Sequence, residues 1–187
     1  RERAYNDKMT GKLRMNGVPM GMQFSITAIG VIMLQSANNA LGTMYVAAFT
    51  AAARAKYIFT CVYENIGVAM ATYCGQNIGA GKIERVKLGI KAAMKITVVF
   101  FLVTTVIIYF FADEMMLLFI DAEKTDIIAI AAQYMLITSY FCLAWGTLTV
   151  FRYSLQGLGY SNLSVLSGVM ELIARCGVSL WVVPTFG

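Results

Sequence analysis

Charged side chains inside long apolar segments are the residues of this sequence that could do chemistry. Glu64, Glu171 and Arg175 each interrupt such a segment. A charge at the centre of a membrane-spanning helix costs about 2.5–3.5 kcal/mol on insertion scales, so it needs a partner or a function. Glu171 and Arg175 are four residues apart and therefore share one helix face, where they can neutralise each other. We expect them to face the protein interior, as a structural ion pair or as a polar element beside a substrate path.

Glu64 has no basic residue three or four positions away along the chain. Lys56 is two helical turns distant, about 12 Å along a helix axis. Three alternatives remain for Glu64: it faces water, it pairs with a residue of another helix, or it is protonated. Gln35 and Asn39 are also four residues apart, and we expect them to form an interhelical hydrogen bond or to contact a substrate.

Several kinds of chemistry are excluded by the residue types present. The sequence has no His, and the spacings of its four Cys residues do not match a zinc site. An intramembrane enzyme would need catalytic groups at matched depth, which the absence of His and of paired aspartates argues against. We therefore expect no catalytic residue, no metal site and no cofactor. The four cysteines, which we interpret as packing residues, are Cys61, Cys74, Cys142 and Cys176.

A glycine-rich segment contains Gly75, Gly79 and Gly81 and invites comparison with a phosphate-binding loop. That motif requires Gly, four residues, and then Gly-Lys-Ser/Thr. Counting back from Gly81 places Gln76 at the first glycine position, and Ile83 stands where the hydroxyl should be. The segment instead predicts a tight turn that ends one helix, with Gly79 or Gly81 at positive φ.

The composition is that of a membrane protein. Of the 187 residues, 59% are hydrophobic and 13% are charged, whereas soluble domains are about 45–50% apolar and about 25% charged. So few charges cannot cover a water-exposed surface, and we expect the lipid bilayer to surround the chain. The net charge of +5 lies between apolar runs and not on one polar face, so no nucleic-acid partner is expected.

Charge-free runs long enough to span a bilayer predict an all-α, polytopic fold with five transmembrane helices. The run from Met15 to Ala53 is too long for one span, and Asn38, Asn39 and Gly42 predict a turn within it. Residues 1–16 are expected to be a cytoplasmic linker and residues 17–187 a membrane domain. The five helices are predicted at about residues 17–39, 46–74, 90–112, 127–150 and 163–185. Residues 113–126 and 152–162 are expected to connect them.

The basic residues predict the orientation. Most of the 15 Lys and Arg residues precede the first predicted helix or lie at residues 82–95, between or beside the second and third. Residues 113–126 hold acidic residues and a single Lys. Because cytoplasmic loops carry the excess of Lys and Arg, we expect the N-terminus to be cytoplasmic in a plasma-membrane protein.

Several segments, in order, resemble multidrug and toxic compound extrusion (MATE) transporters. Residues 75–85 are similar to the loop after the second helix of a lobe in that family, and they are the most specific element. The other similar segments are Gly17-Val-Pro-Met-Gly21, Val46-Ala-Ala-Phe-Thr50 and Leu155-Gln-Gly-Leu-Gly159, followed by Glu171 and Arg175. They resemble the starts of the seventh and eighth helices, the loop after the tenth, and the eleventh.

The resemblance implies a parent of twelve helices in two lobes, of which this chain would supply helices seven to eleven, most of a six-helix lobe. Both chain ends look cut from something longer, so a missing N-terminal lobe of the same polypeptide is an expected partner. Family members export amphipathic or cationic compounds in exchange for Na+ or H+, which implies an antiporter and not an enzyme. The alternatives are a flippase for lipid-linked saccharides, for which Arg54, Lys56 and Arg175 are the basic candidates, and a non-transporting membrane scaffold.

The chain departs from the family at one position. Some members carry a cation-binding glutamate about eight residues after the proline of the seventh helix, and Thr27 stands at that position here. The resemblance then implies coupling through an acidic residue of the missing N-terminal lobe. The candidates for a substrate or ion path are Thr27, Gln35, Asn39, Glu64, Glu171 and Arg175.

Overall fold

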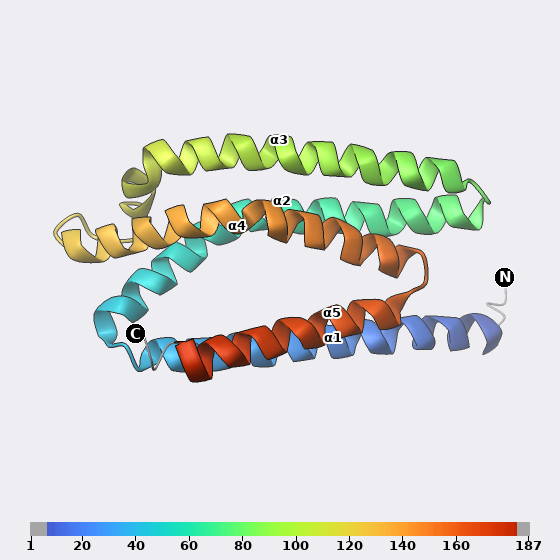
Figure 1. Cartoon of the computed structure of the whole chain (residues 1–187), viewed down its shortest axis with the longest axis horizontal. Coiled ribbons are helices and arrows are strands. Elements are labelled where there is room, and N and C mark those ends of the chain that lie inside the picture. The colour runs from blue at the N-terminus through green and yellow to red at the C-terminus, as the bar shows by residue number, and fades with distance from the viewer. Residues whose placement is uncertain (1–6, 183–187) are drawn as a thin grey trace, which may run out of the picture.

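The computed structural model describes residues 7–182, and this part of the chain consists of long helices joined by short turns (Figure 1). The elements are α1 (Asp7–Asn39), α2 (Thr43–Gly79), α3 (Ile83–Met116), α4 (Thr125–Gly157), α5 (Ser161–Gly177) and a short π-helical segment η1 (Val178–Val182) that continues α5. No strand occurs between residues 7 and 182. The prediction of an all-α fold is therefore confirmed.

Most helices extend beyond the apolar runs that predict them. α1 begins at Asp7, so residues 7–16, expected to be a linker, are helical, and Pro19 lies inside the helix. The predicted connection at 113–126 shortens to 117–124, and the one at 152–162 shortens to 158–160. Hydropathy marks only the apolar part of a helix, whereas backbone hydrogen bonding continues into its polar ends. Residues 1–6 of the expected linker and 183–185 of the expected fifth helix lie outside the described residues.

Glycines at positive φ form two of the turns. Gly42 (φ 104°) lies between α1 and α2, and Gly81 (φ 70°) lies between α2 and α3. Glycine adopts this conformation without the steric cost that a Cβ imposes. The predicted turns at these two places are confirmed, but Gly75 and Gly79 are residues of α2 and not of the turn. The turn is shorter than expected because the helical hydrogen bonds of α2 continue through both glycines.

Three helices, α2, α3 and α4, pack into one layer around small side chains. Ala48, Ala52 and Ala55 of α2 are almost fully buried and meet Ala131 and Ala132 of α4. Small residues let helix backbones approach closely, which is how helices associate where lipid removes the hydrophobic driving force between them. Larger buried side chains such as Met116 of α3 and Met135 of α4 fill the rest of this core.

The helices α1 and α5 form a second unit, packed side by side (Figure 1). α2 begins beside this pair and crosses to α3 and α4 (Figure 1). The start of α1 and the turns after α2 and α4 lie at one end of the bundle. The turns after α1 and α3 lie at the other (Figure 1). The basic turn at residues 80–82 and the acidic connection at 117–124 are thus at opposite ends.

Within residues 7–182, four segments are long and apolar enough to cross a membrane. They are Gly17–Asn39, Ile83–Met116, Thr125–Gly157 and Ser161–Trp181. Side chains such as Leu102, Val106 and Tyr109 form an exposed apolar stripe on α3, as expected for a face in contact with lipid. α2 is not among the four, and it carries Arg54, Lys56 and Glu64. The predicted first span begins at the same residue as the first of these segments.

Gly157 should be the glycine of α4 least tolerant of substitution. A Cβ there would overlap the backbone of Ala71 on α2, which cannot rotate away. We expect Gly157→Ala to cost about 1–3 kcal/mol through overpacking. Gly79→Ala is the matched control, because Gly79 is helical with nothing within 4 Å of its Cβ position. Thermal unfolding in detergent compares the two variants, and equal midpoints would contradict the close α2–α4 contact.

Candidate functional site

A cavity of about 680 Å³ lies between the α1–α5 pair and helices α2 and α4. Its walls combine charged, hydroxyl and aromatic side chains. The lining residues include Gln23, Phe24, Thr27, Lys56, Tyr57, Thr60, Glu64, Thr138, Phe141, Trp145, Arg152, Tyr153 and Arg175. A volume of about 300–1,000 Å³ with a few polar groups in an apolar wall is typical of a small-molecule site. We therefore treat this cavity as the candidate site.

Glu64 of α2 is the carboxylate of the cavity wall, and its partner comes from another helix. The Tyr153 hydroxyl of α4 donates a hydrogen bond to Glu64 Oε2 at 3.0 Å. One of the three alternatives for Glu64, pairing with another helix, is thus confirmed, although with a neutral group. Among the described residues Glu64 has no ion pair.

Gly67, one turn after Glu64, makes this hydrogen bond possible. A Cβ at Gly67 would lie 2.5 Å from Cδ2 of Tyr153, closer than side-chain atoms approach in real structures. The absence of a side chain therefore lets the Tyr153 ring pack closely against α2, with its hydroxyl hydrogen-bonded to Glu64. The glycine acts on Glu64 through Tyr153 and does not itself line the cavity.

Glu171 is the centre of a largely buried cluster with two arginines. Arg175 Nη2 donates to Glu171 Oε1 at 2.7 Å, which confirms the predicted pair on α5. Arg152 Nη2 of α4 donates to Glu171 Oε2 at 3.0 Å and to Ser167 Oγ at 3.1 Å. The side chains of Arg152, Glu171 and Arg175 are 10%, 14% and 24% exposed. The pair is therefore a triad that ties α4 to α5, and both arginines line the cavity.

A second polar contact ties the α1–α5 pair to α4. The Gln23 side-chain oxygen of α1 accepts hydrogen bonds from Gln156 Nε2 (2.9 Å) and Ser164 Oγ (2.5 Å). Gln156 Nε2 is also 2.7 Å from Ser164 Oγ. Gln23 is 3% exposed, and a buried amide is stable only when its hydrogen bonds are satisfied. These bonds and the triad join the two units of the fold beside the cavity.

Lys56 lies in the wall with a neutral partner. Its Nζ donates to the Tyr134 hydroxyl at 3.2 Å, and the same nitrogen is 5.5 Å from the Tyr134 ring centroid. Lys56 and Arg175, two of the three basic residues considered for a flippase, thus line this cavity, whereas Arg54 lines two smaller pockets.

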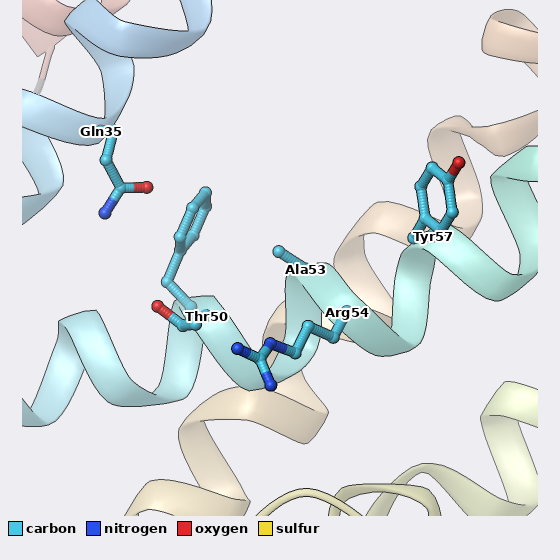
Figure 2. Close-up of a pocket in the computed structure, with 6 residues that line it drawn as sticks. Gln35, Thr50, Ala53, Arg54 and Tyr57 are labelled. Carbon is cyan, nitrogen blue, oxygen red and sulfur yellow. The ribbon is translucent and has the colours of Figure 1, made fainter.

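The remaining predicted site residues are divided between two places. Thr27 lines the large cavity. Gln35 lines a separate pocket of about 380 Å³ together with Thr50, Arg54 and Tyr57 of α2 (Figure 2). Gln35 Nε2 donates to Asn39 Oδ1 at 3.1 Å on the same helix, so within residues 7–182 the hydrogen bond of this pair is intrahelical and not interhelical. The alternative of a substrate contact stays a prediction. Asn39 is exposed near the end of α1.

Three further residues, Arg152, Tyr153 and Gln156, belong to the site but could not be predicted as such from the sequence. They were expected in a loop because two glycines follow closely, but α4 continues to Gly157. Their partners lie on other helices, at separations that no helical spacing rule covers. The one available signal was Arg152 itself, a charge that directly follows the apolar Val150-Phe151.

The comparison with known protein families gives a match over most of the chain. A family model described as MatE matches residues 19–180, which is most of the chain and includes parts of every helix. No curated protein matches the sequence.

Proposed function

Because the chain belongs to the MatE family of transporters, we propose that it forms one lobe of a secondary antiporter that exports small amphipathic compounds in exchange for Na+ or H+. The cavity between the two helical units is the proposed substrate and ion path. The chain is a multi-pass membrane protein, and we propose the plasma membrane as its location. It acts as a transporter and not as an enzyme.

One observation supports the proposal most strongly: a single cavity joins Glu64 to an aromatic wall. Ionisable residues at membrane depth usually mark ion or substrate paths. Phe24, Phe141 and Trp145 supply flat apolar surface for the body of an amphipathic compound. Glu64 supplies a carboxylate that can hold the coupling ion, with Tyr153 fixing its position.

The proposed mechanism is alternating access. An N-terminal lobe of the same polypeptide would complete the path, and movement of the two lobes would open the cavity to each side in turn. α2 would be the fifth span, since it packs within the α2–α3–α4 layer and places its charged residues Lys56 and Glu64 in the cavity wall. The start of α1 and the basic turn at residues 80–82 would be cytoplasmic, following the excess of Lys and Arg at that end.

Side-specific cysteine labelling of the complete transporter tests this mechanism. With every native cysteine of the transporter replaced by alanine, including the four of this chain, Thr138→Cys in the cavity wall should react with a membrane-impermeant thiol reagent from both sides, and the reaction should stop transport. Its neighbour Ile137 is 52% exposed and lies outside the wall. Ile137→Cys should face lipid and stay unreactive.

Glu84→Cys, near the exposed α2–α3 turn, reports sidedness and should react only from the cytoplasm. Reaction of Thr138→Cys from one side alone under all conditions would contradict alternating access. Reaction of Glu84→Cys from outside would overturn the proposed orientation.

A further inference from the structure

We propose that the cavity binds the anionic group of an amphipathic substrate, such as a sulfonate, carboxylate or phosphate ester carried on an apolar body. This rests on the proposed function, since it assigns a substrate class to the same cavity. The family resemblance implies amphipathic or cationic substrates. The present inference selects amphipathic compounds that carry a negative charge.

The charges around the cavity carry an excess of positive sign. Of the charged side chains between residues 7 and 182, Lys56, Arg152 and Arg175 line the cavity together with the carboxylate of Glu64. Glu171 adds a second carboxylate behind the wall, but it is shared between two arginines. Three cationic groups therefore stand against two carboxylates. In a cavity with low-dielectric walls, such an excess of positive charge attracts anionic ligands and repels cationic ones.

Lys56 is the cation that lacks a counter-ion. Its partners are the hydroxyl and the ring of Tyr134, both neutral, and no ion pair is recorded for it within residues 7–182. A partly buried ammonium group without a carboxylate is costly at membrane depth. An anion in the cavity would supply the missing charge, and the same contact would give the substrate its affinity.

The unpartnered polar atoms in the cavity wall are suited to an acceptor ligand. Trp145 Nε1, Arg152 Nε and Thr27 Oγ1 are buried without a hydrogen-bond partner, and all three residues line the cavity. Trp and Arg can only donate, and Thr can donate. An unmade hydrogen bond of a buried donor costs about 1–3 kcal/mol. Neighbouring atoms cover these three atoms in this structure. A small shift of the wall would present them as donors to the oxygens of an anionic group, which are acceptors only.

The rest of the wall suits an apolar body. Phe24, Tyr57, Phe141 and Leu148 line the same cavity, which at about 680 Å³ has the size of a site for a drug-sized molecule. Glu64 can hold the small coupling ion without making the cavity a site for organic cations, since three cationic groups line the same space and would repel such a compound. The site is thus amphipathic, with a positive polar part.

A matched pair of permanently charged probes tests the proposal. The full chain is placed in phosphatidylcholine nanodiscs with Trp181→Phe, so that Trp145 of the cavity wall is the remaining tryptophan. Adamantane-1-sulfonate and trimethyl-1-adamantylammonium share one apolar body and differ in the sign of charge. We expect the sulfonate to change Trp145 fluorescence at about tenfold lower concentration than the ammonium probe.

Two variants should shift this preference in opposite directions. Lys56→Met should weaken sulfonate binding about tenfold. Glu64→Gln should strengthen sulfonate binding and weaken binding of the ammonium probe. Lys91→Met is the matched control, because Lys91 is exposed on α3 away from the cavity.

The outcomes separate this inference from the proposed function. Tighter binding of the ammonium probe, lost in Glu64→Gln, would overturn the anion proposal and leave a transport cavity for cations. If neither probe changes Trp145 fluorescence, the claim that this cavity is a substrate site is overturned, and the anion proposal with it. Equal loss of sulfonate binding in Lys56→Met and Lys91→Met would also overturn the proposal.

Discussion

Glu171→Gln should destabilise the folded chain by about 3–5 kcal/mol, the cost of breaking a buried ion pair by removing one partner. The carboxylate holds Arg175 at 2.7 Å and Arg152 at 3.0 Å, in surroundings where all three side chains are largely buried. Its removal leaves two arginines without a counter-ion and loosens the contact between α4 and α5. Thermal unfolding in detergent and the yield of monodisperse protein measure the effect.

Because Glu171 is shared between two arginines, substitutions of Glu171 and of Arg175 should cost unequal amounts of stability. Arg175→Gln should cost less, since Glu171 keeps Arg152. If Glu171 and Arg175 formed an isolated ion pair, the double variant Glu171→Gln/Arg175→Gln would regain the stability that Glu171→Gln alone loses. Here it should not, because Arg152 remains unpaired, and adding Arg152→Gln should recover most of the loss. Wild-type stability in Glu171→Gln, or full recovery in the double variant, would contradict the triad.

Glu64→Gln should reduce ion-driven transport about 10–100-fold while the chain stays folded. The amide oxygen can still accept the Tyr153 hydrogen bond, so the local geometry is preserved. The charge that would hold Na+ or H+ is lost, and a hydrogen bond to a charged group contributes about 1.5–3 kcal/mol, which corresponds to this range. Transport into liposomes under an imposed ion gradient measures the change.

Glu84→Gln is the matched control for that experiment. Glu84 lies in the first turn of α3, its side chain is 81% exposed, and its ion pair with Lys87 lies at the surface. Exposed pairs of this kind contribute little, so the variant should transport like the wild type. Equal losses in both variants would point to a general effect of net charge and would contradict the role proposed for Glu64.

The helices could be predicted from the sequence because lipid imposes a simple rule: a span needs about 20 apolar residues. Their ends could not, because a helix such as α4 continues past its apolar part through Arg152 to Gly157. The turn at Gly81 was predictable from glycine chemistry. Gly75 was misplaced because a glycine in the polar end of a helix has the same sequence appearance as one in a turn.

The candidate site was predictable only where its contacts lie within one helix. The Glu171–Arg175 pair follows from a spacing of four residues, and the structure forms it. Arg152 joins the same carboxylate from another helix, and Tyr153 reaches Glu64 across 89 residues of sequence. Such contacts depend on how helices pack, which small residues such as Gly67 determine. Spacing in the sequence carries no record of them.

Gradient-driven transport by the complete transporter tests the central claim, that this cavity belongs to an ion-coupled antiporter, most directly. Proteoliposomes would receive adamantane-1-sulfonate or trimethyl-1-adamantylammonium outside, with an outwardly directed Na+ or H+ gradient. The account predicts accumulation of at least one probe above its external concentration, collapse of that accumulation when an ionophore dissipates the gradient, and its loss in Glu64→Gln. Accumulation of neither probe, or equal uptake with and without the gradient, would contradict it.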